Sequence, residues 1–209
     1  MKIVFLSLVI LVAAFCSTAA AGGYGTLDIS VRDLSGKPIG EATVYAIYSE
    51  RVGSRIPRFR SDSAGKLVLR GLPPGSYEVY AFKESEGYAD TFFAFFATYN
   101  KKAWQVVQVY GGRTTNVVLE LGPKCATLKL VVRNEQGAAV GGTLIFTRPD
   151  QPHPYQQGIS GDTSVLVPPV AFRFKIEAEG YEVWQSKVLR PRPDETIEIK
   201  VRLTRESSP

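Results

Sequence analysis

The stretch that decides the fold runs from Thr26 to Ile47 and reads TLDISVRDLSGKPIGEATVYAI. Within it Leu27, Ile29 and Val31 alternate with polar residues, which is the period-two pattern of a strand with one buried face. The following DLSG has an Asp at the first position of a type I turn and a Gly at the fourth. The stretch therefore predicts a strand, a tight turn and a returning strand.

The same landmarks recur later in the chain. TLKLVVRNEQG begins at Thr127, 101 residues after Thr26, and the EGY at residues 86–88 returns at 179–181. Landmarks that repeat in one order predict two copies of one module. We place the copies at 25–121 and 126–204, with a linker at 122–125, where Gly and Pro interrupt the strands, and a tail at 205–209. The predicted fold class is all-β, with two tandem immunoglobulin-like or transthyretin-like sandwiches.

Residues 1–21 have the pattern of an export signal. Lys2 precedes an apolar run too short to span a bilayer, and small residues follow at Ala19–Ala21. Two alternatives are a retained N-terminal anchor and a lipoprotein signal at Cys16, which the bulky Phe15 before it disfavours. We therefore expect an exported protein, periplasmic or extracellular.

Charge and cysteine content narrow the possible partners. The chain holds 25 Lys and Arg against 20 Asp and Glu, a formal charge of +5 that falls to +4 once residues 1–21, with their single Lys, are removed. So mild a charge, without a dense basic stripe, does not indicate nucleic-acid binding, and it does not favour membrane contact. Cys125 then stands alone, so no internal disulfide is expected.

The first copy also carries a family resemblance. TLDISVRDLSGKPIGEATVYAI together with DSAGKLVLRGLPPGSYEVYAFKESEGY resembles the carboxypeptidase regulatory-like domain, a transthyretin-like sandwich related to the collagen-adhesin B repeat. The resemblance covers most of 25–121 and, more loosely, 126–204. It implies a non-catalytic module, usually an appendage of secreted, periplasmic or surface proteins, and no peptidase activity.

The scarcity of histidine counts against most site chemistries. His153 is the only one, and it lies among prolines, whereas a zinc site needs three or four ligands. The single histidine also argues against a catalytic Ser-His-Asp or Cys-His arrangement, because no second base is evident. We expect no enzyme activity, no metal and no cofactor, and an unrecognised hydrolase is the least favoured class.

The first copy is longer than the second in two places, and these supply the candidate contact residues. One is Arg-rich, at residues 50–60, and the other is aromatic, at residues 89–104. Counting strands places both at the end of the first sandwich that faces the linker, and binding residues often lie on such loops. The candidates are Arg55, Arg58, Arg60, Phe92, Phe93, Phe95, Phe96, Tyr99 and Trp104.

The aromatic stretch allows several interpretations. Its phenylalanines occupy both faces of an alternating pattern, as in a strand covered on both sides, and such a strand would pack against the second module. Alternatively it contacts a protein or cell-envelope partner, stacks sugars through Tyr99 and Trp104, or touches anionic lipid. We expect a non-catalytic binding or structural accessory protein with a protein or envelope polysaccharide partner; the alternative is a carbohydrate-binding protein that uses the exposed aromatics of 89–104.

Overall fold

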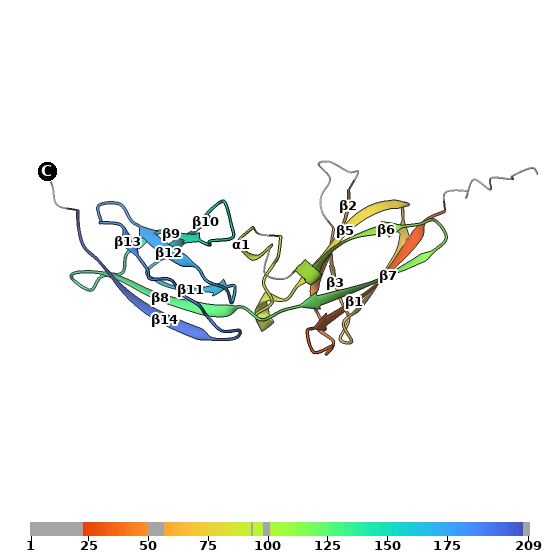
Figure 1. Cartoon of the computed structure of the whole chain (residues 1–209), viewed down its shortest axis with the longest axis horizontal. Helices are drawn as coiled ribbons and strands as arrows, with labels where there is room; N and C mark the ends of the chain where they lie inside the picture. Colours follow the sequence, from red (N-terminus) through yellow and green to blue (C-terminus); the bar gives the residue numbers. More distant parts are fainter. Residues whose placement is uncertain (1–22, 50–56, 93, 98–100, 207–209) are drawn as a thin grey trace, which may run out of the picture.

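A computed structural model describes residues 23–49, 57–92, 94–97 and 101–206. The strands form four sheets, two in each of two bodies that follow one another along the long axis (Figure 1). The predicted all-β class with two sandwiches is confirmed.

The first body pairs a three-stranded sheet, ordered β4-β1-β7, with a four-stranded sheet, ordered β3-β2-β5-β6. Its strands are β1 (Gly25–Asp33), β2 (Thr43–Tyr48), β3 (Arg58–Arg60), β4 (Lys66–Leu72), β5 (Gly75–Phe82), β6 (Trp104–Val109) and β7 (Thr114–Leu121). Most neighbours are antiparallel, but β1 and β7 run parallel, in register from Thr26 opposite Thr114 to Asp33 opposite Leu121.

The second body repeats this arrangement strand for strand. Its sheets are ordered β11-β8-β14 and β10-β9-β12-β13, and β8 and β14 again run parallel. Its strands are β8 (Ala126–Asn134), β9 (Gly141–Thr147), β10 (Tyr155–Ser160), β11 (Asp162–Val167), β12 (Arg173–Glu177), β13 (Trp184–Gln185) and β14 (Thr196–Leu203).

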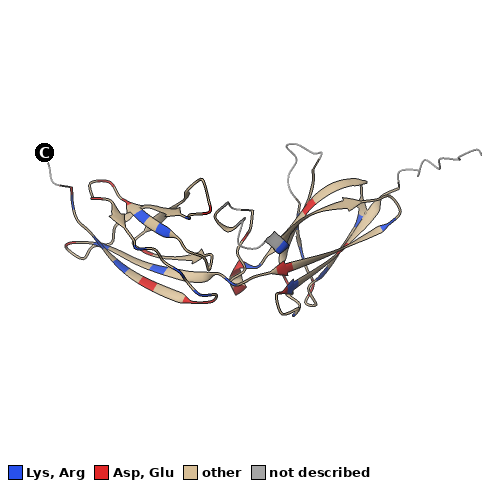
Figure 2. Ribbon diagram, in the orientation of Figure 1, with Lys and Arg blue, Asp and Glu red and all other residues tan. Residues whose placement is uncertain are grey.

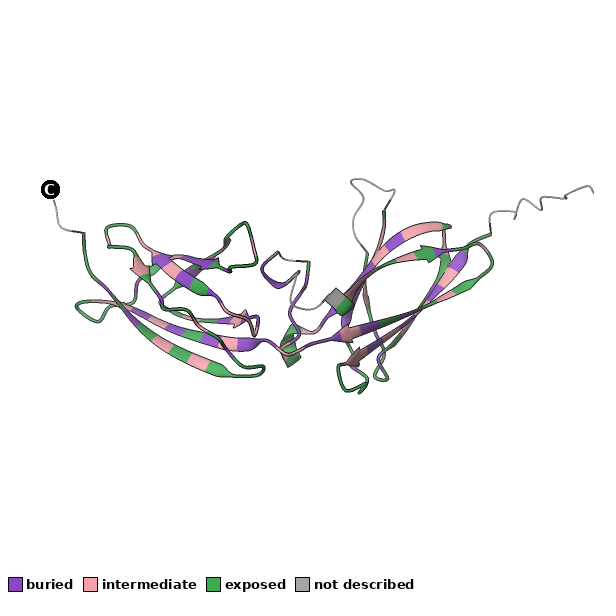
Figure 3. Cartoon of the chain, viewed as in Figure 1, coloured by how far each residue is buried: buried purple, intermediate pink, exposed green. Residues whose placement is uncertain are grey.

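Alternation along the strands builds each core. In β1 the side chains of Leu27, Ile29 and Val31 are buried while the residues between them are partly exposed, as the sequence predicts. In the second body Leu128 and Leu130 of β8 occupy the matching places. Figure 3 shows buried residues alternating with exposed ones along these strands. Lys and Arg are interspersed with Asp and Glu along the strands of both bodies (Figure 2).

The predicted turn after β1 is confirmed. The Gly36 amide donates to the Asp33 carbonyl at 3.0 Å, and Asp33 Oδ1 accepts from the amides of Ser35 and Lys37 at 2.8 and 2.9 Å. Gly36 has φ of +89°, which a residue without Cβ adopts at little cost. In the second body Asn134 and Gly137 form the same turn.

Three short helical elements lie between β5 and β6 in the first body. They are η1 (Glu84–Glu86), the single turn α1 (Ala94–Ala97) and η2 (Lys101–Ala103). Figure 1 shows α1 between the two bodies, beside the second one. The alternating phenylalanines indicated a strand here, whereas Ala94–Ala97 form a helical turn, because Phe95 and Phe96 pack into the core of the second body instead of pairing with a neighbouring strand.

Candidate interaction surface

A row of large side chains crosses the outer face of the four-stranded sheet in the first body. Strand register places Arg58 of β3 beside Tyr45, Tyr45 beside Tyr80, and Tyr80 beside Trp104. Because Tyr77, Val79 and Ala81 of β5 point into the core, Tyr80 points outward. We call these four residues, together with Phe92, the aromatic face.

The rings of the aromatic face stack on one another. Tyr45 and Tyr80 lie 5.0 Å apart between centroids at an interplanar angle of 22°. Phe92 stacks on Tyr80 at 5.9 Å and 17°, and on Trp104 at 6.3 Å and 26°. Such offset pairs add to the stability that burial alone provides. Tyr80 is only 2% exposed, and its burial raises the pKa of its hydroxyl, so the phenol stays neutral at physiological pH.

Part of this face remains open. Phe92 is 50% exposed, and Val106, two residues along β6 from Trp104 and on the same side of the sheet, is 68% exposed. At the β3 edge Arg58 Nη2 donates to Thr43 Oγ1 at 3.2 Å, while Arg60 lies 3.8 Å from a Glu41 carboxylate oxygen. The surface is therefore apolar at its centre and has arginine along one edge.

Two candidate contact residues belong elsewhere. Phe95 and Phe96 are 3% and 7% exposed and form part of the core of the second body. Their side chains offer nothing to an outside partner, which corrects the expectation that they bind one. The alternative interpretation of this stretch, packing against the second module, describes them.

Three further candidates, Arg55, Phe93 and Tyr99, lie outside the described residues. The sugar-stacking hypothesis relied on Tyr99 and Trp104 as a pair, and only Trp104, which is partly buried, is described. Arg58, Arg60, Phe92 and Trp104 lie on or beside the aromatic face.

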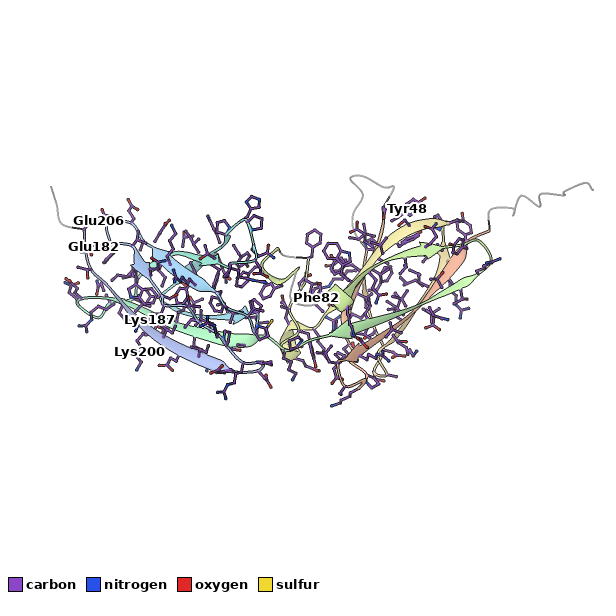
Figure 4. The ribbon with its side chains drawn as sticks, in the orientation of Figure 1. Tyr48, Phe82, Glu182, Lys187, Lys200 and Glu206 are labelled. Carbon is purple, nitrogen blue, oxygen red and sulfur yellow. The ribbon has the colours of Figure 1, made fainter. Side chains whose placement is uncertain are left out.

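The two inserted segments leave the four-stranded sheet at opposite ends. β2 ends at Tyr48, opposite Tyr77, whereas β5 ends at Phe82, opposite Thr43; Figure 4 labels Tyr48 and Phe82 at these two ends. The aromatic segment is at the linker end, since the Gly87 carbonyl accepts from the Cys125 amide at 2.7 Å. The expectation of a shared end was wrong because the strand count omitted the short β3.

Sequence reasoning missed Tyr45 and Tyr80. The signal was present, because assigning Tyr77, Val79 and Ala81 to the core places Tyr80 and Phe82 on the opposite face. Tyr45 follows from the same argument on β2, where Val44 and Ala46 are buried.

Asp90 lies at the base of the aromatic face. It is 9% exposed, and its Oδ1 accepts from the Phe92 amide at 2.9 Å. Burial raises the pKa of this carboxyl, and the positive charge of Arg58 opposes the rise only in part. The native state therefore favours protonated Asp90, and this stabilisation is lost as pH rises through the native pKa.

Asp90→Asn should raise the midpoint of thermal unfolding at neutral pH, because Asn keeps an oxygen acceptor for the Phe92 amide and removes the buried charge. The gain should shrink as pH falls through the native pKa toward about 4, where the native carboxyl is protonated and the unfolded one is about half protonated. Thermal unfolding followed by circular dichroism from pH 4 to 8 checks this. A difference that does not vary with pH would contradict the assignment.

The described residues offer little for a catalytic or metal site. Among them no group of three or more His, Cys, Asp or Glu side chains could hold a metal ion. Within the same part of the chain, no helix has the length and apolar character needed to cross a membrane.

Comparison with known proteins shows no family for this chain. No protein-family model matches the chain, and no curated protein does. Among solved structures, the Bacillus anthracis TIE protein is similar over 88% of this chain and 34% of its own, at 14% identity and a TM-score of 0.39. A streptococcal ancillary pilin is similar over 88% of this chain and 63% of its own, at 9% identity and a TM-score of 0.45. The minor pilin of Streptococcus agalactiae is similar over 88% of this chain and 98% of its own, at 14% identity and a TM-score of 0.42.

The chain thus spans about a third of the first of these proteins and less than two thirds of the second. Likenesses this distant carry no information about function. The class that the fold itself defines is an all-β protein of two tandem sandwiches.

Proposed function

We propose that the protein is a non-catalytic, exported accessory protein that binds a protein partner through the aromatic face of its first sandwich. The observation that carries the proposal is the row of Arg58, Tyr45, Tyr80 and Trp104 across one sheet, with Phe92 stacked on it and half exposed. Trp, Tyr and Arg are the residue types that contribute most binding energy in protein interfaces.

The ring geometry favours a protein partner over a sugar. A sugar platform needs an open ring face, and Tyr80 offers none, because Tyr45 and Phe92 lie nearly parallel to it and Trp104 lies 5.5 Å away at 40°. What remains open is an area around Phe92 and Val106, with Glu78 opposite Val106 on β5 and with Arg58 on the far edge strand β3. Exposed apolar patches with polar rims are typical of protein contact sites.

Two further parts of the proposal rest on other observations. Export is supported by the signal-like pattern of residues 1–21. Assignment of both sandwiches to the carboxypeptidase regulatory-like, transthyretin-like class is supported by the sequence resemblance and by the strand order that the two bodies share.

The test is site-specific photo-crosslinking. A photoreactive amino acid at Val106, which is exposed on the edge strand β6 beside the aromatic face, is compared with one at Lys200, which is exposed on β14 of the second body (Figure 4). Each form of the chain, beginning at residue 22, is irradiated with envelope fractions of the source organism. We expect a discrete protein adduct at position 106, none at 200, and loss of the adduct when Phe92→Ala or Trp104→Ala is added.

Co-sedimentation with peptidoglycan and insoluble polysaccharides decides the alternative. Binding that Trp104→Ala abolishes, with the fold intact, would replace the protein partner by a carbohydrate one. Adducts of equal yield at both positions, or at neither, would overturn the aromatic face as the contact surface.

A further inference from the structure

Part of the segment between β5 and β6 of the first body packs against the second body, since Ala89, Phe95 and Phe96 lie in the second core. Phe95, on α1, lies 4.9 Å from Phe146, 5.3 Å from Tyr155 and 6.1 Å from Phe172, measured between ring centroids. We call these three second-body residues the aromatic socket. Phe95 stacks on Tyr155 at 12° and meets Phe172 edge-on at 83°, both favourable arrangements of aromatic rings.

A buried arginine of the second body holds the same segment by its backbone. The Arg148 side chain is only 1% exposed, and its Nη1 donates to the Phe95 carbonyl. Its Nε and Nη2 donate to the Asp150 carboxylate at 3.0 and 2.5 Å, and its guanidinium carbon lies 5.9 Å from the centre of the Phe95 ring. A buried guanidinium is costly unless its donors are satisfied, and here one acceptor comes from the other body.

The linker adds contacts at the same place. Ala89 and Cys125 are buried in the core of the second body, and the Cys125 amide donates to the Gly87 carbonyl. Lys124 Nζ lies 5.7 Å from the centre of the Tyr88 ring.

We infer that the aromatic socket is an interaction surface whose occupant is α1 of the first body, and that the two sandwiches consequently unfold as one cooperative unit. Domains move relative to one another unless their interface is large and hydrophobic, and segments with few buried apolar contacts open locally before the rest of a protein unfolds. Here the second core is incomplete without Phe95 and Phe96. This inference is independent of the proposed function.

The chain provides its own reporters, because its two tryptophans lie one in each body. Trp104 is on β6, and Trp184 is on β13, 5.4 Å from Phe174. Trp184→Phe leaves fluorescence that reports only the first body, and Trp104→Phe leaves fluorescence that reports only the second. In urea titrations of each variant we expect the fluorescence transition to coincide with that of far-ultraviolet circular dichroism, which reports both bodies.

A mutation confined to the second core makes the test decisive. Leu130 is 1% exposed within β8, and Leu130→Ala should lower the urea midpoint seen by Trp104, in the other body, as much as the midpoint seen by Trp184. Equal shifts support the inference. A shift confined to the Trp184 signal, or fluorescence and dichroism transitions that separate in either variant without Leu130→Ala, would overturn it.

Discussion

Phe95→Ala is expected to lower the free energy of unfolding by about 3–5 kcal/mol, the range for removing a fully packed phenylalanine. The ring is 3% exposed and fills the aromatic socket of Phe146, Tyr155 and Phe172. With it gone, Arg148 loses the ring beside its guanidinium, and the core of the second body loses one of the two phenylalanines that the first body contributes to it. Urea unfolding followed by circular dichroism measures the loss.

Phe92→Ala is the matched control, three residues away on the same segment. Phe92 is half exposed and stacks on Tyr80 and Trp104 of the first body, so its loss should cost about 1 kcal/mol. If both variants lost the same small amount, the segment would not be anchored in the second core.

Gly65→Ala is expected to cost about 2–5 kcal/mol, for two separate reasons. Gly65 has φ of +73°, which costs a residue with a Cβ roughly 1–2 kcal/mol. The added carbon would also lie 2.4 Å from the Val31 carbonyl oxygen, against a backbone that cannot turn away, and overpacking of this kind costs about 1–3 kcal/mol more. The variant should unfold at a lower urea concentration with an unchanged slope.

Gly36→Ala distinguishes the cost of the positive φ from the cost of the close contact with Val31. Gly36 has a similar φ of +89°, but nothing lies within 4 Å of the added carbon. It should therefore lose only the backbone part, about 1–2 kcal/mol. Equal losses in the two variants would show that the close approach of residue 65 to Val31 does not contribute.

The strands were predictable where burial is decided locally. Alternation of Leu27, Ile29 and Val31 determines which face of β1 points inward, and Asp33 with Gly36 determines where the strand ends, through hydrogen bonds within five residues. The outer face follows from the same alternation, so Tyr80 could have been included in the candidate surface.

The remaining features depend on distant partners. Alternating phenylalanines indicate a strand only if a neighbouring strand accepts their hydrogen bonds, and the conformation of Phe95 and Phe96 is decided instead by residues about 50 positions later, such as Phe146. β3 has one inward side chain, Phe59, between two arginines, which is too short a pattern to detect. Because the strand count left out β3, it reversed the inferred directions of β4 and β5.

Parallel pairing of the first and last strands in each body determines how the chain would carry tension. The chain enters the first body at Gly25, at the start of β1, and leaves it at Leu121, at the far end of β7. A pull along the long axis therefore draws these two neighbours past each other, so the hydrogen bonds of the ladder bear the load in shear and must fail together. β8 and β14 repeat the geometry, and the short linker connects the two in series. Such a pull would load the two bodies in series. The aromatic face lies on the four-stranded sheet, which does not contain β1 and β7 and is therefore off the path of the force.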